Sequence, residues 1–454
     1  MRTLIRCGWI VSMDEALGTL GDAEGFVEDD RIAAGGRNLA AATDTTIDAR
    51  GMIALPGLVN AHMHTFQSAT RGLGSEWLAP DYFRHQFGNL SPRYTHEDNY
   101  LGNLMGALNQ IDHGVTTLLD YCHNLKSLEQ ASRSVDGLEE SGIRAVFCMG
   151  RGAPAPVAGN APPQGQPRHL REAVIELRKG RLASRERRVT MALAMSGPHW
   201  SAWEICIENV RLARELGLIA SSHVTRRHAQ GVVPDGYDRM AAEGLLGPDH
   251  NLVHCQLLTN DELRRLLDTG ASITSTCLNE THDYPESPAA GRVHALGYLP
   301  SLGVDVEAQV PADMWRETQT ALRAARQDAL RGIAARGEQP ARMPVRSRDA
   351  LSWATLGGAR ALQLEDRIGS LKPGKKADLV LLRATDLNLF PVHDPVYAVE
   401  QAHAGNVDTV MIDGVVRKQH GRLLFDNKLL RQRQEELAES ARRLIHEAGY
   451  RPST

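Results

Sequence analysis

Eight short apolar runs alternate with helical patterns through the middle of the chain, and this alternation constrains the fold more than any other feature. Amphipathic patterns separate most of the runs, as at 98–112, 127–141, 203–216 and 261–268. Eight parallel strands joined by helices over about 300 residues are what a (β/α)8 barrel requires. The sequence therefore predicts an α/β fold with a TIM-like barrel, whose strands are expected at 57–64, 115–121, 144–150, 189–196, 218–223, 251–255, 272–276 and 298–305.

Both ends of the chain are rich in short strands and turns. A strand at 2–10 and a hairpin turn at Asp29-Asp30 precede the barrel, and apolar runs at 377–382 and 409–412 follow it. We expect these pieces to form one small β-sandwich domain, because both flank the barrel. The predicted limits are residues 1–55 with 369–425 for this domain, 56–368 for the barrel and 426–454 for an amphipathic helical tail.

The composition excludes several classes of protein. Hydrophobic residues make up 42% and charged residues 23% of the 454 residues, which excludes a mainly disordered chain. A formal charge of −4 gives no field for holding nucleic acid or an anionic membrane. No apolar run reaches the roughly 18 residues of a membrane span, and the first residues lack a signal-peptide core. Six scattered cysteines without a CxxC pair predict reduced thiols and a cytoplasmic protein.

The sharpest chemical feature is His62-Met63-His64 at the end of the first barrel strand. Residues two apart on a strand point to the same side, so both imidazoles are expected at the carboxyl end of the barrel, where barrel enzymes place their sites. His223, His254 and Asp305 end later strands. Two buried structural histidines are the alternative for an HxH alone, but five candidates at four strand ends predict a metal site.

The order of these residues resembles the metal-dependent amidohydrolase superfamily, in the branch of the cytosine deaminases, S-adenosylhomocysteine deaminases and triazine hydrolases. The segments 55–64 and 368–380 and the loop after the first strand carry the resemblance, which covers nearly the whole chain. It implies that His62, His64, His223 and Asp305 hold a metal ion. It also implies that Asp305 takes a proton from the attacking water while His254 holds and polarises that water.

The expected number of metal ions depends on a lysine that the fourth strand lacks. Binuclear relatives bridge two ions with a carboxylated lysine on the fourth strand, but no lysine occurs here between Lys179 and Lys372. We therefore expect one divalent ion per chain. Zn²⁺ is the first choice and Fe²⁺ the alternative, because imidazole and carboxylate suit both.

One position departs from the pattern of the deaminases. These enzymes carry a glutamate three residues after the strand-five histidine, where it protonates the substrate's ring nitrogen, but Arg226 stands there in this chain. Arginine stays protonated near neutral pH, so it cannot donate and recover a proton. We expect the acid to come from the loop after strand seven, with Glu280 as the first choice and His282 as the second. The alternative for both is a solvated loop.

Four further residues are predicted to line the substrate pocket: Gln67, Trp77, His199 and Trp315. Each has an alternative as an ordinary packing or turn residue. Substrate identity is expected to lie in the loops at 65–87, 152–168 and 277–288, because barrel enzymes vary their chemistry there.

The leading hypothesis is hydrolysis of a carbon–nitrogen bond other than a peptide bond, most simply removal of an amino group from a nitrogen heterocycle. The second is hydrolysis of a cyclic amide or amidine, or displacement of another leaving group, and the missing glutamate favours it. A non-catalytic scaffold fits least, because the ligand set is complete. The expected partner is a small-molecule substrate, with no nucleic acid and no membrane, in a homo-oligomer for which a dimer is the simplest form.

Overall fold

The middle of the chain forms a parallel barrel, in the computed structural model that describes residues 1–39, 42–152 and 168–451. Eight parallel strands pair in chain order, and the barrel closes where the amide of His64 donates to the carbonyl of Asp305 (2.9 Å) and that of Asp305 to His62 (3.1 Å). The predicted (β/α)8 class is confirmed. The strands are β5 (Leu58–Met63), β6 (Val115–Cys122), β7 (Arg144–Met149), β8 (Val189–Met195), β9 (Ala220–Val224), β10 (His250–His254), β11 (Ser272–Ser275) and β12 (Ser301–Leu302).

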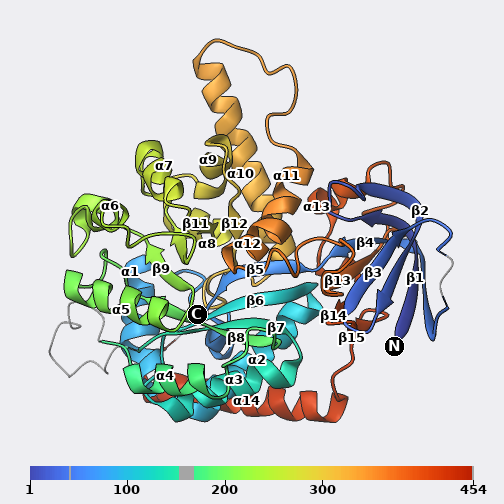
Figure 1. The fold of residues 1–454 in the computed structure, drawn as a ribbon. Coiled ribbons are helices and arrows are strands. Elements are labelled where there is room, and N and C mark those ends of the chain that lie inside the picture. The colour runs from blue at the N-terminus through green and yellow to red at the C-terminus, as the bar shows by residue number, and fades with distance from the viewer. Residues whose placement is uncertain (40–41, 153–167, 452–454) are drawn as a thin grey trace.

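Helices surround the barrel and begin at recognisable caps (Figure 1). The hydroxyls of Thr95, Ser127 and Thr259 accept amide hydrogen bonds at three helix starts, and the Asp313 carboxylate caps a fourth. The helices from strand to strand are α2 (His96–Asp112), α3 (Leu128–Ser141), α4 (Arg171–Lys179), α5 (Trp203–Glu215), α6 (Gly236–Ala242), α7 (Asn260–Asp268), α8 (Cys277–Asp283), α9 (Ala289–Ala295) and α10 (Met314–Ala335), with short α1 (Ala79–Tyr82), α11 (Ser347–Ser352) and α12 (Gly358–Ala361). Most of the predicted 152–168 loop lies outside the described residues.

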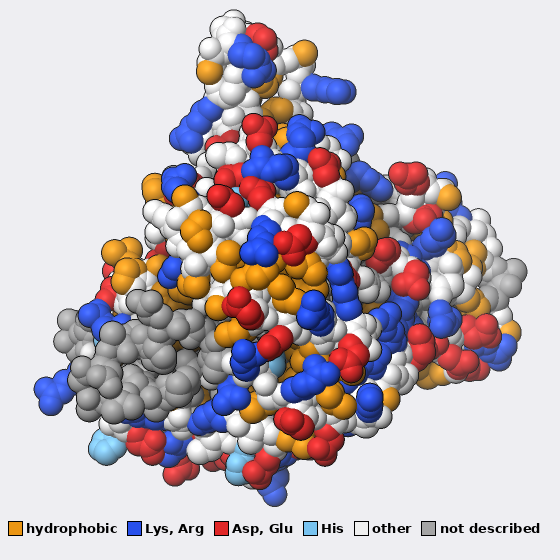
Figure 2. Space-filling view, turned by 60° about the vertical axis from the view of Figure 1, so that its left-hand side comes forward, with side chains coloured by type: hydrophobic (Ala, Val, Ile, Leu, Met, Phe, Trp, Pro, Cys, Tyr) orange, Lys and Arg blue, Asp and Glu red, His pale blue; other side chains and the backbone are white. Residues whose placement is uncertain are grey.

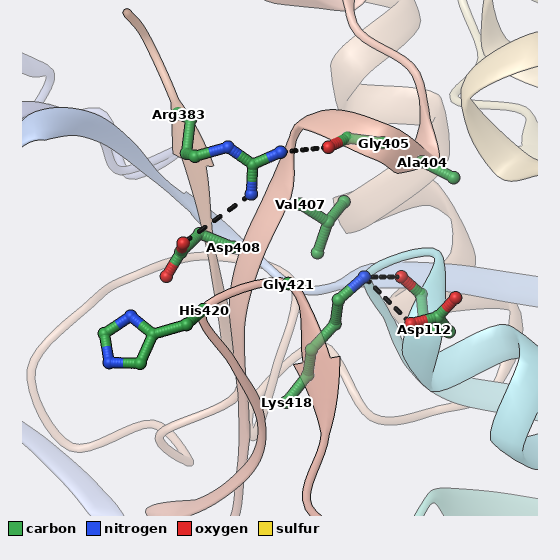
Figure 3. Close-up of a pocket in the computed structure, with 9 residues that line it drawn as sticks. All are labelled: Asp112, Arg383, Ala404, Gly405, Val407, Asp408, Lys418, His420 and Gly421. Atoms are coloured by element: carbon green, nitrogen blue, oxygen red, sulfur yellow. Dashed lines mark hydrogen bonds and ion pairs between the residues drawn. The ribbon is translucent and has the colours of Figure 1, made fainter. Parts of the chain in front are cut away.

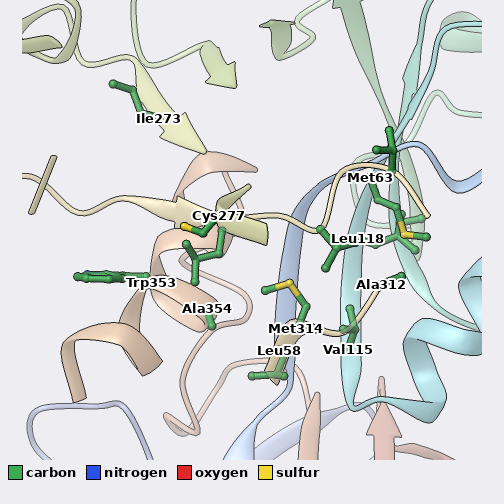
Figure 4. Close-up of a cluster of buried hydrophobic side chains, with 14 of the residues drawn as sticks. Leu58, Met63, Val115, Leu118, Ile273, Cys277, Ala312, Met314, Trp353 and Ala354 are labelled. Atoms are coloured by element: carbon green, nitrogen blue, oxygen red, sulfur yellow. The ribbon is translucent and has the colours of Figure 1, made fainter. Parts of the chain in front are cut away.

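The barrel strands are buried on both faces. Every residue of β5, β6 and β7 is buried, as expected for parallel strands that helices cover. Figure 4 shows Leu58 and Val115, the first residues of β5 and β6, near Met314, which begins α10. This packed lower part leaves the carboxyl ends of the strands as the place for polar chemistry.

The two ends of the chain build a second, mixed sheet, which lies to one side of the barrel (Figure 1). Its strand order is β16-β15-β14-β13-β4-β1-β2-β3, with β1 parallel to β4 and the other pairs antiparallel. The predicted small β domain is therefore present, while its exact limits stay a prediction. The strands are β1 (Arg2–Val11), β2 (Thr19–Glu28), β3 (Arg31–Gly36), β4 (Thr45–Pro56), β13 (Leu379–Arg383), β14 (Val407–Ile412), β15 (Val415–Gln419) and β16 (Arg422–Leu423).

A buried ion cluster joins this sheet to the amino-terminal end of the barrel. Arg144, the first residue of β7, donates to both carboxylate oxygens of Asp378 (2.8 and 3.1 Å) and also contacts Asp413. The side chains of Arg144 and Asp378 are only 4% and 2% exposed, so the pair is sheltered from solvent. The sheet therefore supports the barrel from the end opposite the candidate site.

The chain ends in helix α14 (Asn427–Glu447), which lies beside α2 (Figure 1). Ser440 and Arg443 on α14 both contact Asp98 of α2. Beyond the helix, the Tyr450 hydroxyl accepts a hydrogen bond from Trp77 Nε1 at 3.1 Å. The tail thus reaches the segment that follows β5. Within the described ranges, no helix has the length and apolar character needed to cross a membrane.

Candidate active site

Four side chains converge at the carboxyl ends of the barrel strands. His62 and His64 come from β5, His223 from β9, and Asp305 from the segment that closes the barrel. Their ligand atoms all lie within 4.8 Å of one another. His223 Nε2 is 3.2 Å from His62 Nε2 and 3.3 Å from His64 Nε2, and Asp305 Oδ1 is 3.3 Å from each of the last two atoms.

The state of these groups suits a divalent metal ion. Burial lowers the pKa of His62 to about 4 and that of His223 well below its usual value, so both imidazoles are neutral and offer lone pairs. His64 Nδ1 lies 2.8 Å from the Tyr121 carbonyl, an arrangement that assigns its proton to Nδ1 and leaves Nε2 free. Burial opposes ionisation of Asp305, yet the facing imidazoles hold its pKa well below the usual range. Three imidazoles and one carboxylate form a fitting donor set for zinc.

Two of the site residues have an unusual backbone. Asp305 has φ = 60° and His254 has φ = 75°, in the left-handed region that non-glycine residues seldom adopt. Such residues cost on the order of 1–3 kcal/mol each and persist where the surrounding structure imposes them. The turn at each strand end thereby directs a polar side chain over the end of the barrel.

His254 lies beside the cluster and is held from behind. Its Nε2 is 4.0 Å from Asp305 Oδ2, while its Nδ1 is 2.9 Å from the Thr276 hydroxyl and 3.5 Å from Glu280 Oε1. Burial works against protonation of this ring, but Glu280 and Asp305 together raise its pKa. His254 can therefore present a proton next to the Asp305 carboxylate.

The loop after β5 is tied to the segment after Asp305. Arg71 Nε donates to Glu307 Oε1 (3.0 Å), and the amides of Gly72 and Gly74 donate to the carbonyls of Glu307 and Ala308. This pairing places Gln67 and Trp77 above the barrel end. The side-chain nitrogen Nε2 of Gln67 donates to the Tyr82 hydroxyl at 2.7 Å.

A cavity of about 510 Å³ lies between the end of α2 and the second sheet, at the other end of the barrel (Figure 3). Its charged side chains neutralise one another: Lys418 Nζ pairs with Asp112 at 2.9 Å, and Arg383 lies 3.6 Å from Asp408. It contains none of the four clustered ligands. The carboxyl end of the barrel is therefore the better candidate for catalysis.

Comparison with known proteins identifies the family. The model of the amidohydrolase family matches residues 53–417. The chain belongs to the amidohydrolase family. A 5-methylthioadenosine/S-adenosylhomocysteine deaminase of Desulforudis audaxviator is 30% identical to this amidohydrolase over 466 residues, covering 98% of this chain and 99% of the relative. A 5'-deoxyadenosine deaminase of Methanobrevibacter smithii is 26% identical over 450 residues, covering 93% of each.

Solved structures share the fold of this amidohydrolase. An adenosine deaminase from Xanthomonas campestris with bound zinc superposes with a TM-score of 0.81 at 20% identity, covering 98% of each chain. An atrazine chlorohydrolase from Arthrobacter aurescens, complexed with zinc and atraton, gives 0.81 at 18% identity and covers 97% of this chain and all of the other. The barrel with a small second domain is therefore common to enzymes that release different leaving groups.

The four predicted pocket residues of the amidohydrolase have different surroundings. Gln67 is buried, and its Oε1 has no hydrogen-bond partner among the described residues. Trp77 is 7% exposed, and its carbonyl accepts from His282 Nε2 and Gln309 Nε2, both at 2.9 Å. His199 faces His228 of the segment after β9, with 3.1 Å between the ring nitrogens. Substrate contact by these three residues stays a prediction.

The structure corrects the assignment of Trp315. Its indole nitrogen donates to the carbonyl of His113 at 2.9 Å, and the side chain is only 1% exposed. His113 precedes β6, so this contact lies toward the amino-terminal end of the barrel. Trp315 therefore packs in the core at the end opposite the metal ligands, because the first turn of α10 faces inward there.

The segment after β11 is helical, not the loop that the sequence suggested. Glu280 is fully buried on α8, where Oε2 accepts from the Ser275 hydroxyl (2.6 Å) and Oε1 from the Thr276 amide (2.7 Å). His282 Nε2 is engaged by the Trp77 carbonyl. Both residues lie next to the site, and a role for either as the proton donor stays a prediction.

The sequence analysis missed two side chains near the site. His123, three per cent exposed and directly after β6, lies against His64 with 4.2 Å between ring centroids and 49° between the ring planes. Asp283, the last residue of α8, has a side chain that is 4% exposed. The only sequence signal for Asp283 was its position directly after His282. A single acidic residue in a predicted loop otherwise resembles an ordinary surface residue.

Hydrophobic side chains gather on the face that carries the site. Figure 2 shows them in the middle of this face, with charged side chains around them. Leu78 and Phe83 in the segment after β5 and Val232 after β9 remain 59%, 39% and 49% exposed. An apolar surface beside polar catalytic groups is suited to a flat heterocyclic ring.

Proposed function

We propose that this amidohydrolase holds one zinc ion per chain through His62, His64, His223 and Asp305 and hydrolytically deaminates an amino-substituted nitrogen heterocycle. The observation that carries the proposal is the convergence of four ligand atoms within 4.8 Å with His254 beside Asp305. The relatives named as deaminases of adenosine derivatives support an aminopurine nucleoside as substrate.

The single ion is supported by the fourth strand. β8 contains no lysine, so the group that bridges two ions in binuclear relatives has no counterpart on this strand. Fe²⁺ is the alternative occupant, because the same donors accept it.

The side chains have distinct tasks in this reaction. His62, His64, His223 and Asp305 would hold a zinc ion, which when bound would lower the pKa of water towards neutrality. Asp305 takes a proton from the attacking water and delivers it to the departing amine, which leaves as ammonia. His254, held by Thr276 at 2.9 Å, donates a hydrogen bond to the oxygen that attacks the ring carbon.

A second candidate function has support from one position. Arg226 occupies the place of the usual acid, and its guanidinium stacks on the Trp200 ring at 3.8 Å. A substrate with a better leaving group than an amine needs less help from an acid. Displacement of chloride or hydrolysis of a cyclic amidine is therefore the alternative.

Ammonia release distinguishes the candidates. Purified, zinc-loaded enzyme is offered adenosine, 5'-deoxyadenosine, aminopyrimidines and aminotriazines, together with chlorinated and cyclic-amidine counterparts. We expect ammonia from the aminopurine nucleosides. Chloride release or ring opening without ammonia would favour the second function, and zinc analysis that returns two ions per chain would contradict the single-ion site.

We further propose a cytoplasmic homodimer that acts on a small molecule without a nucleic-acid partner. The net charge of −4 supports the absence of a nucleic-acid partner, and the buried, reduced state of the six cysteines supports the compartment. Light scattering measures the oligomeric state directly.

A further inference from the structure

Deamination of a ring amine needs a proton donor. Each residue considered for this role is already engaged by a neighbouring group. Arg226 is stacked on Trp200, and its Nη1 contacts the Gln230 carbonyl of its own segment. Both oxygens of Glu280 are occupied by donors from Ser275 and Thr276, behind His254. The Nε2 proton of His282 is directed to the Trp77 carbonyl.

Asp283 is an acid at this end of the barrel that has a free carboxyl oxygen among the described residues. Its Oδ2 accepts from Gln309 Nε2 at 3.2 Å, while Oδ1 is buried without a hydrogen-bond partner in the described part of the chain. The nearest ion-pair contact of Oδ1 is His282 Nε2 at 3.9 Å. A buried, unpaired carboxyl oxygen costs free energy unless a ligand completes its hydrogen bonding.

The surroundings of Asp283 resemble those of the residues that perform the chemistry. Its side chain is 4% exposed, against 6% for Asp305 and 5% for His254. Burial raises the pKa of Asp283, and the Asp305 charge adds to this effect. The titratable groups that face it are His282 of its own helix, Asp305, His254, Tyr82 and Tyr284.

The helix that carries Asp283 is fixed at its start. The Glu317 carboxylate, on α10, accepts from the amides of Leu278 (3.0 Å) and Cys277. Glu280 ties the next turn to the end of β11. The end of α8 is therefore held in a defined position next to Gln309, which follows Asp305 by four residues.

We propose that Asp283 is the catalytic acid of this enzyme, replacing the glutamate whose usual position holds Arg226. The assignment rests on the proposed deamination and names the residue that makes it possible. The protonated Asp283 carboxyl gives its proton to the ring nitrogen while the water oxygen bonds to the adjacent carbon. The tetrahedral carbon then breaks its bond to the amine, which leaves as ammonia with the proton from Asp305. The hydroxyl proton returns to Asp283 as the carbonyl forms.

The test compares Asp283→Asn with wild type and with Glu286→Gln. Asparagine keeps the size of Asp283 and an oxygen that can accept from Gln309, but it has no acidic proton. Glu286, three residues further along the chain, is the control because it forms an exposed ion pair with Arg227. We expect Asp283→Asn to lower kcat for ammonia release by about 10²–10⁴-fold, with unchanged zinc content and melting temperature. Glu286→Gln should retain wild-type kcat.

An infrared measurement gives a readout independent of turnover. The difference spectrum between wild type and Asp283→Asn at neutral pH should contain the C=O band of one protonated carboxyl group. Equal kcat in both proteins, or a spectrum without that band, would overturn the assignment while leaving deamination intact. If wild type releases no ammonia from any aminoheterocycle offered, the proposed function fails and this assignment fails with it.

Discussion

In the proposed reaction Asp305 is both a metal ligand and a base, and its backbone lies in the left-handed region. Asparagine adopts the same backbone region readily, so Asp305→Asn changes the chemistry without adding strain. The amide cannot accept a proton, so we expect kcat to fall by about 10²–10⁴-fold even at saturating zinc. Stopped assays of ammonia and a melting curve test this, and a variant that keeps wild-type kcat would remove Asp305 from the proton transfer.

His254 and His62 are both buried histidines at strand ends, but only His62 belongs to the ligand cluster. We expect His254→Ala to lose turnover and retain zinc, because the four ligands remain. His62→Ala should lose both, because one of the four ligands is removed. Elemental analysis after dialysis separates the two, and equal zinc loss would make His254 a ligand.

The sequence predicted the four side chains that converge at the candidate metal site better than their neighbours. His62 and His64 were predictable because the two-residue period of a strand decides which side a side chain faces. The position of Trp315 was not predictable, because helical periodicity shows which face of a helix is buried but not at which end of the barrel that face packs. Glu280 was expected to be the proton donor; it lies behind His254, and this place was not predictable because α8 turns its carboxylate back toward β11.

At the scale of elements, the contact between β7 and the second sheet contains a buried cluster of charged side chains. Removal of Arg144 leaves the Asp378 carboxylate, which is 2% exposed, without its partner. We expect Arg144→Met to lower the free energy of unfolding by about 3–5 kcal/mol, measured by urea denaturation. Arg346→Met is the control, since Arg346 is 72% exposed and its pair with Asp349 is worth at most about 1 kcal/mol. Equal losses in the two variants would show that burial of the Arg144 pair has no special effect on stability.

The barrel strands were predicted nearly to the residue, because regular alternation of apolar runs with helices is typical of parallel strands that helices connect. The last strand was overestimated: 298–305 was expected, but the regular strand is only Ser301–Leu302, followed by an isolated bridge between Asp305 and Met63. Beyond it, Gly303 fits closely against His62, where a Cβ would approach its backbone oxygen to 2.7 Å, and Asp305 turns into the left-handed region. Apolar composition cannot reveal that a strand stops where the catalytic geometry begins.

At the scale of the whole molecule, the tail beyond α14 supports the segment after β5. Tyr450→Phe deletes the acceptor of Trp77 Nε1, a hydrogen bond worth about 0.5–1.5 kcal/mol. Because the Trp77 carbonyl holds both His282 and Gln309, we expect a raised KM with little change in unfolding free energy.

Tyr397→Phe is the matched control, since Tyr397 is 47% exposed and its hydroxyl bonds only to Gln401 among the described residues. Steady-state kinetics of both variants on the same nucleoside test the idea. Identical KM values in the two would separate the tail from substrate binding.

The contact between Tyr450 and Trp77 also decides which end of the polypeptide tolerates an appendage. A fluorescent or affinity tag fused after Thr454 would begin four residues beyond Tyr450, which contacts Trp77 in the segment after β5. Met1 lies on the far sheet, where its ammonium group contacts the exposed Asp29 carboxylate. A fusion at that end would give up one exposed ion pair of small energetic value, so immobilised or labelled forms of the enzyme are best attached there.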